Sequence, residues 1–167
     1  VHSFRRRSSD AALLLENPDA LTHVVNLANA SPLIISFLSQ HPLLLDELLD
    51  VRALYAPLSK KDLQEELRQR LDRIHDNDLE SEMDGLRIFK QVNTFRVAAA
   101  DVAGLLPLMK VSDRLTYLAE TVVDQALEMS WEHLVERYGF PSGVRNGEKG
   151  FAIIAYGKLG GIELGYG

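Results

Sequence analysis

The sequence predicts a mainly α-helical protein: a multi-helix, bundle-like body followed by the first strand and glycine-rich turn of an α/β domain. Apolar residues recur every three or four positions through most of residues 1–139, which is the period of helices with one buried face. The period then changes, and residues 151–156 (FAIIAY) form an unbroken apolar run of the length of a buried strand. We therefore predict a helical domain over 1–139, a loop over 140–150 and the start of a second domain over 151–167.

The composition is that of an ordinary globular protein. Of the 167 residues, 46% are hydrophobic and 25% are charged, and no apolar run approaches the length that crosses a bilayer. The formal net charge of -6 disfavours a nucleic-acid partner, which would need a basic face on the protein. Cysteine is absent, which excludes disulfides and cysteine metal sites, and the first residues carry no secretory signal pattern. We expect a cytoplasmic protein with neither nucleic acid nor membrane as a partner.

Prolines begin a series of short helices near the start of the chain. Pro18, Pro32 and Pro42 each stand where a first helical position is expected, with apolar residues at helical spacing after them. A further short helix is predicted before them, over about 9–15. We expect these helices to pack together as a compact head. The leucine-rich stretch 43–49 is predicted to be core, with a partner-binding groove as the alternative.

Three longer helices follow in the prediction. Ser59 marks the start of the first helix, and Ser112 with Asp113 is expected to cap the start of the third helix. Gly139 ends the third helix. The predicted ranges are 60–74, 78–103 and 112–138. Because only a short linker joins the second and third of these helices, we expect them to pack as an antiparallel pair.

Arg96 is the one charged residue of the long helices that we expect to be covered. It lies beside the alanine patch 98–100, where small side chains let a neighbouring helix approach closely. A buried arginine needs a carboxylate partner. We predict a structural ion pair rather than a phosphate contact, with Asp101 and Asp113 as the candidate partners.

A glycine-rich turn directly follows the predicted strand. Gly157, Gly160 and Gly161 allow positive φ and a close backbone approach to a ligand, and Lys158 adds a point charge suited to phosphate. The pattern is neither a Walker A loop nor a dinucleotide fingerprint. The alternative is a tight turn whose lysine is only solvated. The five histidines show no metal-ligand spacing, and no serine, histidine and acid set indicates a hydrolytic triad.

Several stretches of the chain, taken in order, carry a resemblance to one known family. They are ASPLI at 30–34, HPLLLDELLD at 41–50, FK at 89–90 with RVAAADVAG at 96–104, KVSD at 110–113 with LAE at 118–120, and AYGKLGGIELGYG at 155–167. Together they resemble the glutamine synthetase adenylyltransferase/deadenylylase family (bifunctional glutamate-ammonia-ligase adenylyltransferase). The form of the last stretch is similar to the C-terminal, adenylylating half of that family, in which the turn belongs to a nucleotidyltransferase domain.

The resemblance implies a nucleotidyltransferase that moves AMP from ATP to a tyrosine of glutamine synthetase, with two Mg²⁺ ions assisting. The full protein would also remove the AMP, which regulates nitrogen assimilation. By position, Gly157, Lys158, Gly160 and Gly161 would meet the nucleotide. The metal-binding aspartates are expected just after Gly167, so we expect no catalytic or metal-binding residue, no bound cofactor and no activity in residues 1–167 alone.

The alternative is an interaction module. On this hypothesis the helical domain docks glutamine synthetase or a PII-type signalling protein and performs no catalysis of its own. The two hypotheses are compatible within a longer protein. They differ for the present chain, because only the first requires the glycine turn to meet a nucleotide.

Overall fold

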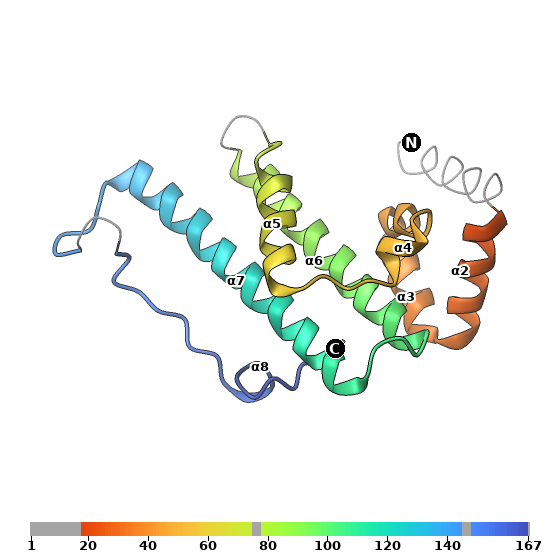
Figure 1. Ribbon diagram of the computed structural model, residues 1–167. Coiled ribbons are helices and arrows are strands. Elements are labelled where there is room, and N and C mark those ends of the chain that lie inside the picture. The colour runs from red at the N-terminus through yellow and green to blue at the C-terminus, as the bar shows by residue number, and fades with distance from the viewer. Residues whose placement is uncertain (1–17, 75–77, 145–147, 167) are drawn as a thin grey trace.

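The computed structural model describes residues 18–74, 78–144 and 148–166, which are almost entirely helical up to residue 138 (Figure 1). This confirms the predicted mainly α-helical class. The short helix expected over about 9–15 lies outside the described residues. The elements are α2 (Pro18–Ala30), α3 (Pro32–Gln40), the 3₁₀ helix η1 (Pro42–Leu48), α4 (Val51–Leu54), α5 (Lys60–Leu71), α6 (Leu79–Val102), α7 (Leu108–Tyr138) and α8 (Gly157–Gly160).

The first four of these elements form the expected head. Pro18 and Pro32 begin α2 and α3 as predicted, whereas Pro42 begins a 3₁₀ helix rather than an α-helix. Leu44 and Leu48 of that 3₁₀ helix are buried, so both belong to the core, as predicted for their stretch. The buried cluster that holds the head against α6 consists of Leu27, Ile34, Leu44, Leu48, Leu54, Val92, Phe95, Ala98 and Ala99.

Helices α6 and α7 run side by side in opposite directions, as predicted, and α5 packs against both (Figure 1). Asp78 caps α6 by accepting a hydrogen bond from the Glu80 backbone N–H. Gly139 ends α7 with a φ of 78°, where glycine has no Cβ penalty. A second buried cluster joins the three helices and consists of Leu63, Leu67, Leu86, Phe89, Leu118 and Met129.

The predicted start of α7 is wrong. The helix begins at Leu108, directly after Pro107, and Ser112 and Asp113 lie inside it rather than capping it. Pro107 has a φ of -61° and extended backbone, so it can lead directly into a helix without a side-chain cap. Ser112 and Asp113 use their polar groups elsewhere, on the Leu164 carbonyl and the Lys110 ammonium respectively.

Arg96 forms the predicted structural ion pair, but both predicted partners are wrong. Its guanidinium lies 2.8 Å from Glu47 Oε2 and 2.9 Å from Glu66 Oε2, and only 13% of its side chain is exposed. Burial alone would lower the pKa of Arg96, but the charges and hydrogen bonds of Glu66 and Glu47 outweigh it and raise the pKa. The ion pairs therefore join the head, α5 and α6 through one side chain.

The predicted buried strand over residues 151–156 is not formed. This segment has no regular secondary structure and is exposed, and the described ranges 18–74, 78–144 and 148–166 contain no β-strand. Phe151 is 64% exposed, Ile154 70% and Tyr156 81%. A strand needs the backbone hydrogen bonds of a neighbouring strand, and the described chain supplies none. The segment passes along α7 as an open trace (Figure 1).

Candidate functional site

The residues of the predicted nucleotide turn form one short helical turn, α8, flanked by glycines. Gly157 has a φ of 60°, which favours glycine over any other residue. A Cβ at Gly160 would lie 2.5 Å from the carbonyl oxygen of Ala155, so no side chain fits there without a backbone shift. Two of the predicted glycines are therefore required by the backbone itself, whether or not a ligand binds.

A Schellman motif ends this helical turn. The backbone N–H of Glu163 donates to the Lys158 carbonyl at 2.7 Å, and the N–H of Ile162 donates to the Leu159 carbonyl at 3.3 Å. The left-handed position of the motif holds Ile162, with a φ of 56°. Glycine usually occupies this position, and an L-residue there costs roughly 1–2 kcal/mol. No sequence signal indicated a left-handed isoleucine, because the neighbouring glycines are the residues expected to adopt positive φ.

The four predicted site residues Gly157, Lys158, Gly160 and Gly161 are all exposed to solvent. Within the described ranges, the Lys158 ammonium has no hydrogen bond or ion pair. Its side chain is thus available to an incoming anion, and the structure equally accommodates the solvated lysine of the alternative interpretation.

The stretch after the turn is attached to the linker end of the α6–α7 pair. The Ser112 hydroxyl donates to the Leu164 carbonyl at 3.1 Å, and the Tyr166 hydroxyl donates to Asp101 Oδ2 at 2.9 Å. Leu164 and Tyr166 pack against the buried cluster of Val97, Val111 and Leu115. Burial raises the pKa of the Tyr166 hydroxyl above its ordinary value, and the Asp101 carboxylate raises it further. No sequence signal indicated these contacts, because their partners lie more than 50 positions apart.

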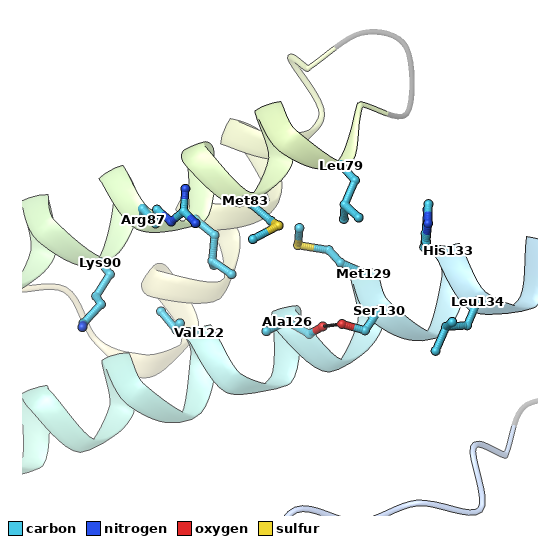
Figure 2. Close-up of a pocket in the computed structure, with 11 residues that line it drawn as sticks. Leu79, Met83, Arg87, Lys90, Val122, Ala126, Met129, Ser130, His133 and Leu134 are labelled. Atoms are coloured by element: carbon cyan, nitrogen blue, oxygen red, sulfur yellow. Dashed lines mark hydrogen bonds between the residues drawn. The ribbon is translucent and has the colours of Figure 1, made fainter.

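An apolar groove lies between α6 and α7, on the part of the pair that the C-terminal stretch leaves open (Figure 2). It has a volume of about 470 Å³ and is lined by Met83, Leu86, Val122, Ala126, Met129 and Leu134, with Arg87, Lys90 and His133 among its polar residues. Met83 and Leu134 are 42% and 52% exposed. A neighbouring cavity of about 400 Å³ shares Lys90 and Val122 with the groove and is bounded by Leu159, Leu164 and Tyr166.

The described residues do not fit a magnesium site. Among them, no three His, Asp or Glu side chains are grouped so that they could hold a metal ion. In the same ranges no helix is long and apolar enough to cross a membrane. The polar chemistry available at the glycine turn is that of one lysine, exposed backbone groups and Glu163.

A family model described as "Glutamate-ammonia ligase adenylyltransferase" matches residues 21–167. The chain belongs to this family. The match covers the helical body together with the glycine turn and the stretch attached to α6–α7. It confirms the family to which the sequence motifs pointed.

Two curated members of the family are similar to the chain over its full length. Both are described as "Bifunctional glutamine synthetase adenylyltransferase/adenylyl-removing enzyme". The protein from Thioalkalivibrio sulfidiphilus (strain HL-EbGR7) is 52% identical and that from Nitrosococcus oceani (strain ATCC 19707) is 55% identical, each over 170 aligned residues. The chain spans 18% of the length of each relative.

Proposed function

We propose that this chain is a portion of an enzyme that transfers AMP from ATP to a tyrosine of glutamine synthetase and, in the longer protein, removes it, thereby regulating nitrogen assimilation in the cytoplasm. The observation that carries the proposal is the match to the two adenylyltransferase/adenylyl-removing enzymes over the whole chain. Residues 1–167 would contribute a helical body and one wall of the nucleotide site. The form of the glycine turn favours the adenylylating half.

We assign nucleotide contact to Gly157, Lys158, Gly160 and Gly161. The exposure of the turn supports this assignment, since both its backbone and the Lys158 side chain are open to a ligand. The exposed apolar segment 151–156 would be the first strand of the nucleotidyltransferase sheet, whose other strands belong to the remainder of the parent protein. Its large apolar side chains would then be buried between that sheet and its covering helices.

ATP and Mg²⁺ are assigned to the longer protein. Because the described residues do not fit a metal site, the aspartate ligands of the metal are proposed to follow Gly167. One lysine and a few N–H groups would face the triphosphate alone. Exposed single-charge contacts contribute at most about 1 kcal/mol, whereas even millimolar binding needs about 4 kcal/mol. Residues 1–167 alone should therefore transfer no AMP and bind ATP at best weakly.

Replacement of Lys158 in the full-length parent enzyme tests the assignment. Lys158→Ala should lower kcat/KM for AMP transfer at least tenfold, because the turn loses its only cation. Lys61→Ala is the matched control, since Lys61 is also exposed but lies on α5. Circular dichroism would establish that both variants keep the helical body. An unchanged turnover for Lys158→Ala would contradict the assignment and would mean that Lys158 is a solvated surface lysine.

A second candidate function is docking of glutamine synthetase by the helical body. The open groove between α6 and α7 favours it, because exposed apolar side chains such as Met83 and Leu134 line a cavity large enough for a partner's side chains. Glutamine synthetase is the occupant to which we commit, since the relatives' names give it as the protein on which they act.

The docking candidate predicts a loss of affinity on changing the groove. In the parent enzyme, Met83→Ser with Leu134→Ser should weaken binding of glutamine synthetase at least tenfold. Leu108→Ser with Met109→Ser is the control, because both residues are 77% exposed but lie outside the groove. Weakened binding of a PII-type protein alone would reassign the groove to that partner. Lowered stability with unchanged affinities would mean that the parent's own chain covers the groove.

A further inference from the structure

Residues 163–166 connect the glycine turn to the helical body through several contacts of different kinds. Two are hydrogen bonds: Ser112 Oγ donates to the Leu164 carbonyl at 3.1 Å, and Tyr166 Oη donates to Asp101 Oδ2 at 2.9 Å. The others are apolar, because Leu164 and Tyr166 pack on the buried cluster that contains Val111. Tyr166 also packs against the cluster that joins the head to α6.

These contacts restrict where the turn can lie. Leu164 is three residues beyond Gly161, and a residue spans at most about 3.6 Å, so the end of the turn stays within about 11 Å of the anchored carbonyl. The Schellman hydrogen bonds of Ile162 and Glu163 shorten this reach further, since they fold the chain back on the turn. Ile162 also keeps its left-handed conformation, which persists only where the surroundings fix the backbone on both sides.

The hydrogen-bonding groups that anchor the stretch lie outside the apolar clusters of the helical body. Asp101 and Ser112 are only partly buried and lie near the two facing ends of α6 and α7. The helices pack through apolar clusters, centred on residues such as Phe89 and Phe95, to which neither Asp101 nor Ser112 belongs. The contacts of Asp101 and Ser112 with the tail thus act on the position of the turn rather than on the fold of the body.

We propose that Asp101, Ser112 and Tyr166 are positioning residues for AMP transfer, which hold the glycine turn at a fixed place on the helical body. The inference rests on the proposed function of the turn as part of the nucleotide site. Transfer of phosphoryl-type groups depends mostly on the placement of the reacting groups, and a displacement of 1 Å can lower the rate about 10²-fold. A turn released from its anchor would still bind nucleotide, but would hold it in the reactive position for a smaller fraction of the time.

The test uses the full-length parent enzyme and a variant that removes one hydroxyl. Tyr166→Phe keeps the ring in both apolar clusters and deletes the hydrogen bond to Asp101. The kcat for AMP transfer should fall about tenfold, with the KM for glutamine synthetase unchanged. Ser112→Ala should act in the same direction. Tyr117→Phe, also on a partly buried tyrosine, is the control, since within the described residues its hydroxyl makes no hydrogen bond.

Two substitutions of Asp101 test whether restoring the hydrogen bond to Tyr166 also restores activity. Asp101→Ala should lower kcat as Tyr166→Phe does, whereas Asp101→Asn should retain most activity, because the amide oxygen still accepts from the Tyr166 hydroxyl. The double variant Tyr166→Phe with Asp101→Ala should be no slower than either single variant, because both remove the same interaction.

Hydrogen exchange of the amides at 157–163 separates this inference from the proposed function. Faster exchange in Tyr166→Phe together with reduced kcat supports the positioning role. Faster exchange with unchanged kcat would overturn it, as would no change in either quantity. If Tyr166→Phe lowers kcat while Lys158→Ala does not, the nucleotide assignment of the turn fails and this inference fails with it.

Discussion

The helical body and the C-terminal tail contain the same kinds of apolar side chain but bury them very differently. In the body, Ile34, Phe89 and Phe95 are 0% exposed, whereas in the tail Phe151 is 64% and Ile154 70% exposed. A helix satisfies its backbone hydrogen bonds within itself and needs only one covered face, so α2–α7 can bury their apolar stripes against one another. A strand needs neighbours on its edges as well. The difference therefore follows from the backbone: the helices of the body cover one another's apolar faces, whereas residues 151–156 have no neighbouring strand among the described residues.

The largest contrast is expected from a matched pair of phenylalanine deletions. Phe89→Ala empties a buried site at the centre of α5, α6 and α7 and should lower the free energy of unfolding by about 3–5 kcal/mol. Phe151→Ala removes a side chain that is mostly in solvent and should change it by less than about 0.5 kcal/mol. Urea unfolding followed by circular dichroism measures both. Equal effects would mean that the tail packs on the body in solution.

A second contrast compares a buried with an exposed ion pair. Arg96→Met leaves Glu47 and Glu66 without their partner and should destabilise the body by about 2–3 kcal/mol, since these carboxylates are only 19% and 27% exposed. Arg87→Met removes a pair with Asp84 whose side chains are 63% and 59% exposed, and should have an effect below about 0.5 kcal/mol. Thermal denaturation at two salt concentrations checks this. A large loss for Arg87→Met would contradict the comparison.

A third prediction uses pH to detach the tail. The folded-state pKa of Tyr166 is raised above the ordinary value of 10.0, so its neutral form is favoured when the tail is attached. The stabilisation is fully present below pH 10 and is lost as the pH rises through the folded-state pKa. The protection of the amides at 163–166, taken relative to their intrinsic base-catalysed exchange rate at the same pH, should therefore fall in strongly alkaline solution, and Tyr166→Phe should remove this fall. A loss of protection with pH that persists in Tyr166→Phe would assign it to another group.

The smallest expected effect concerns the left-handed residue of the turn. Ile162→Gly relieves roughly 1–2 kcal/mol of backbone strain but adds unfolded-state entropy that costs about 0.5–1 kcal/mol, so the turn should gain between about 0 and 1.5 kcal/mol. Ile162→Ala keeps the strain and serves as the control. Slower amide exchange at Glu163 in the glycine variant would support this interpretation. Faster exchange would mean that the Ile162 side chain stabilises the turn by more than the strain of its left-handed backbone destabilises it.

Local signals predicted the helices well, because each signal acts within one turn of the residue that carries it. Pro18 and Pro32 begin their helices, Ser59 accepts a hydrogen bond from the Asp62 N–H, and Gly139 ends α7. The start of α7 was misplaced because Ser112 has the side chain of a cap but donates to a carbonyl 52 residues away. Local preference cannot reveal a competing partner at such a separation.

The same limit applies to the charged and site residues. The burial of Arg96 followed from its alanine neighbours, but its partners Glu47 and Glu66 come from other elements. The glycine turn could be located from the five consecutive residues 157–161 alone. Its attachment through Tyr166 to Asp101 could not, because this contact exists only after α6 and α7 have folded. The apolar character of 151–156 is plain from the sequence, but strand formation depends on neighbouring strands that the described residues do not supply.

The C-terminal tail is attached to the helical body at both ends. Lys149 pairs with Glu128 on α7, and the Leu164 carbonyl accepts from Ser112. The intervening stretch of about 15 residues is thus a closed loop, whose closure in a free chain would cost on the order of 2 kcal/mol by the logarithmic rule. The two attachments thereby reduce the conformational entropy that residues 151–156 would lose on pairing with a neighbouring strand.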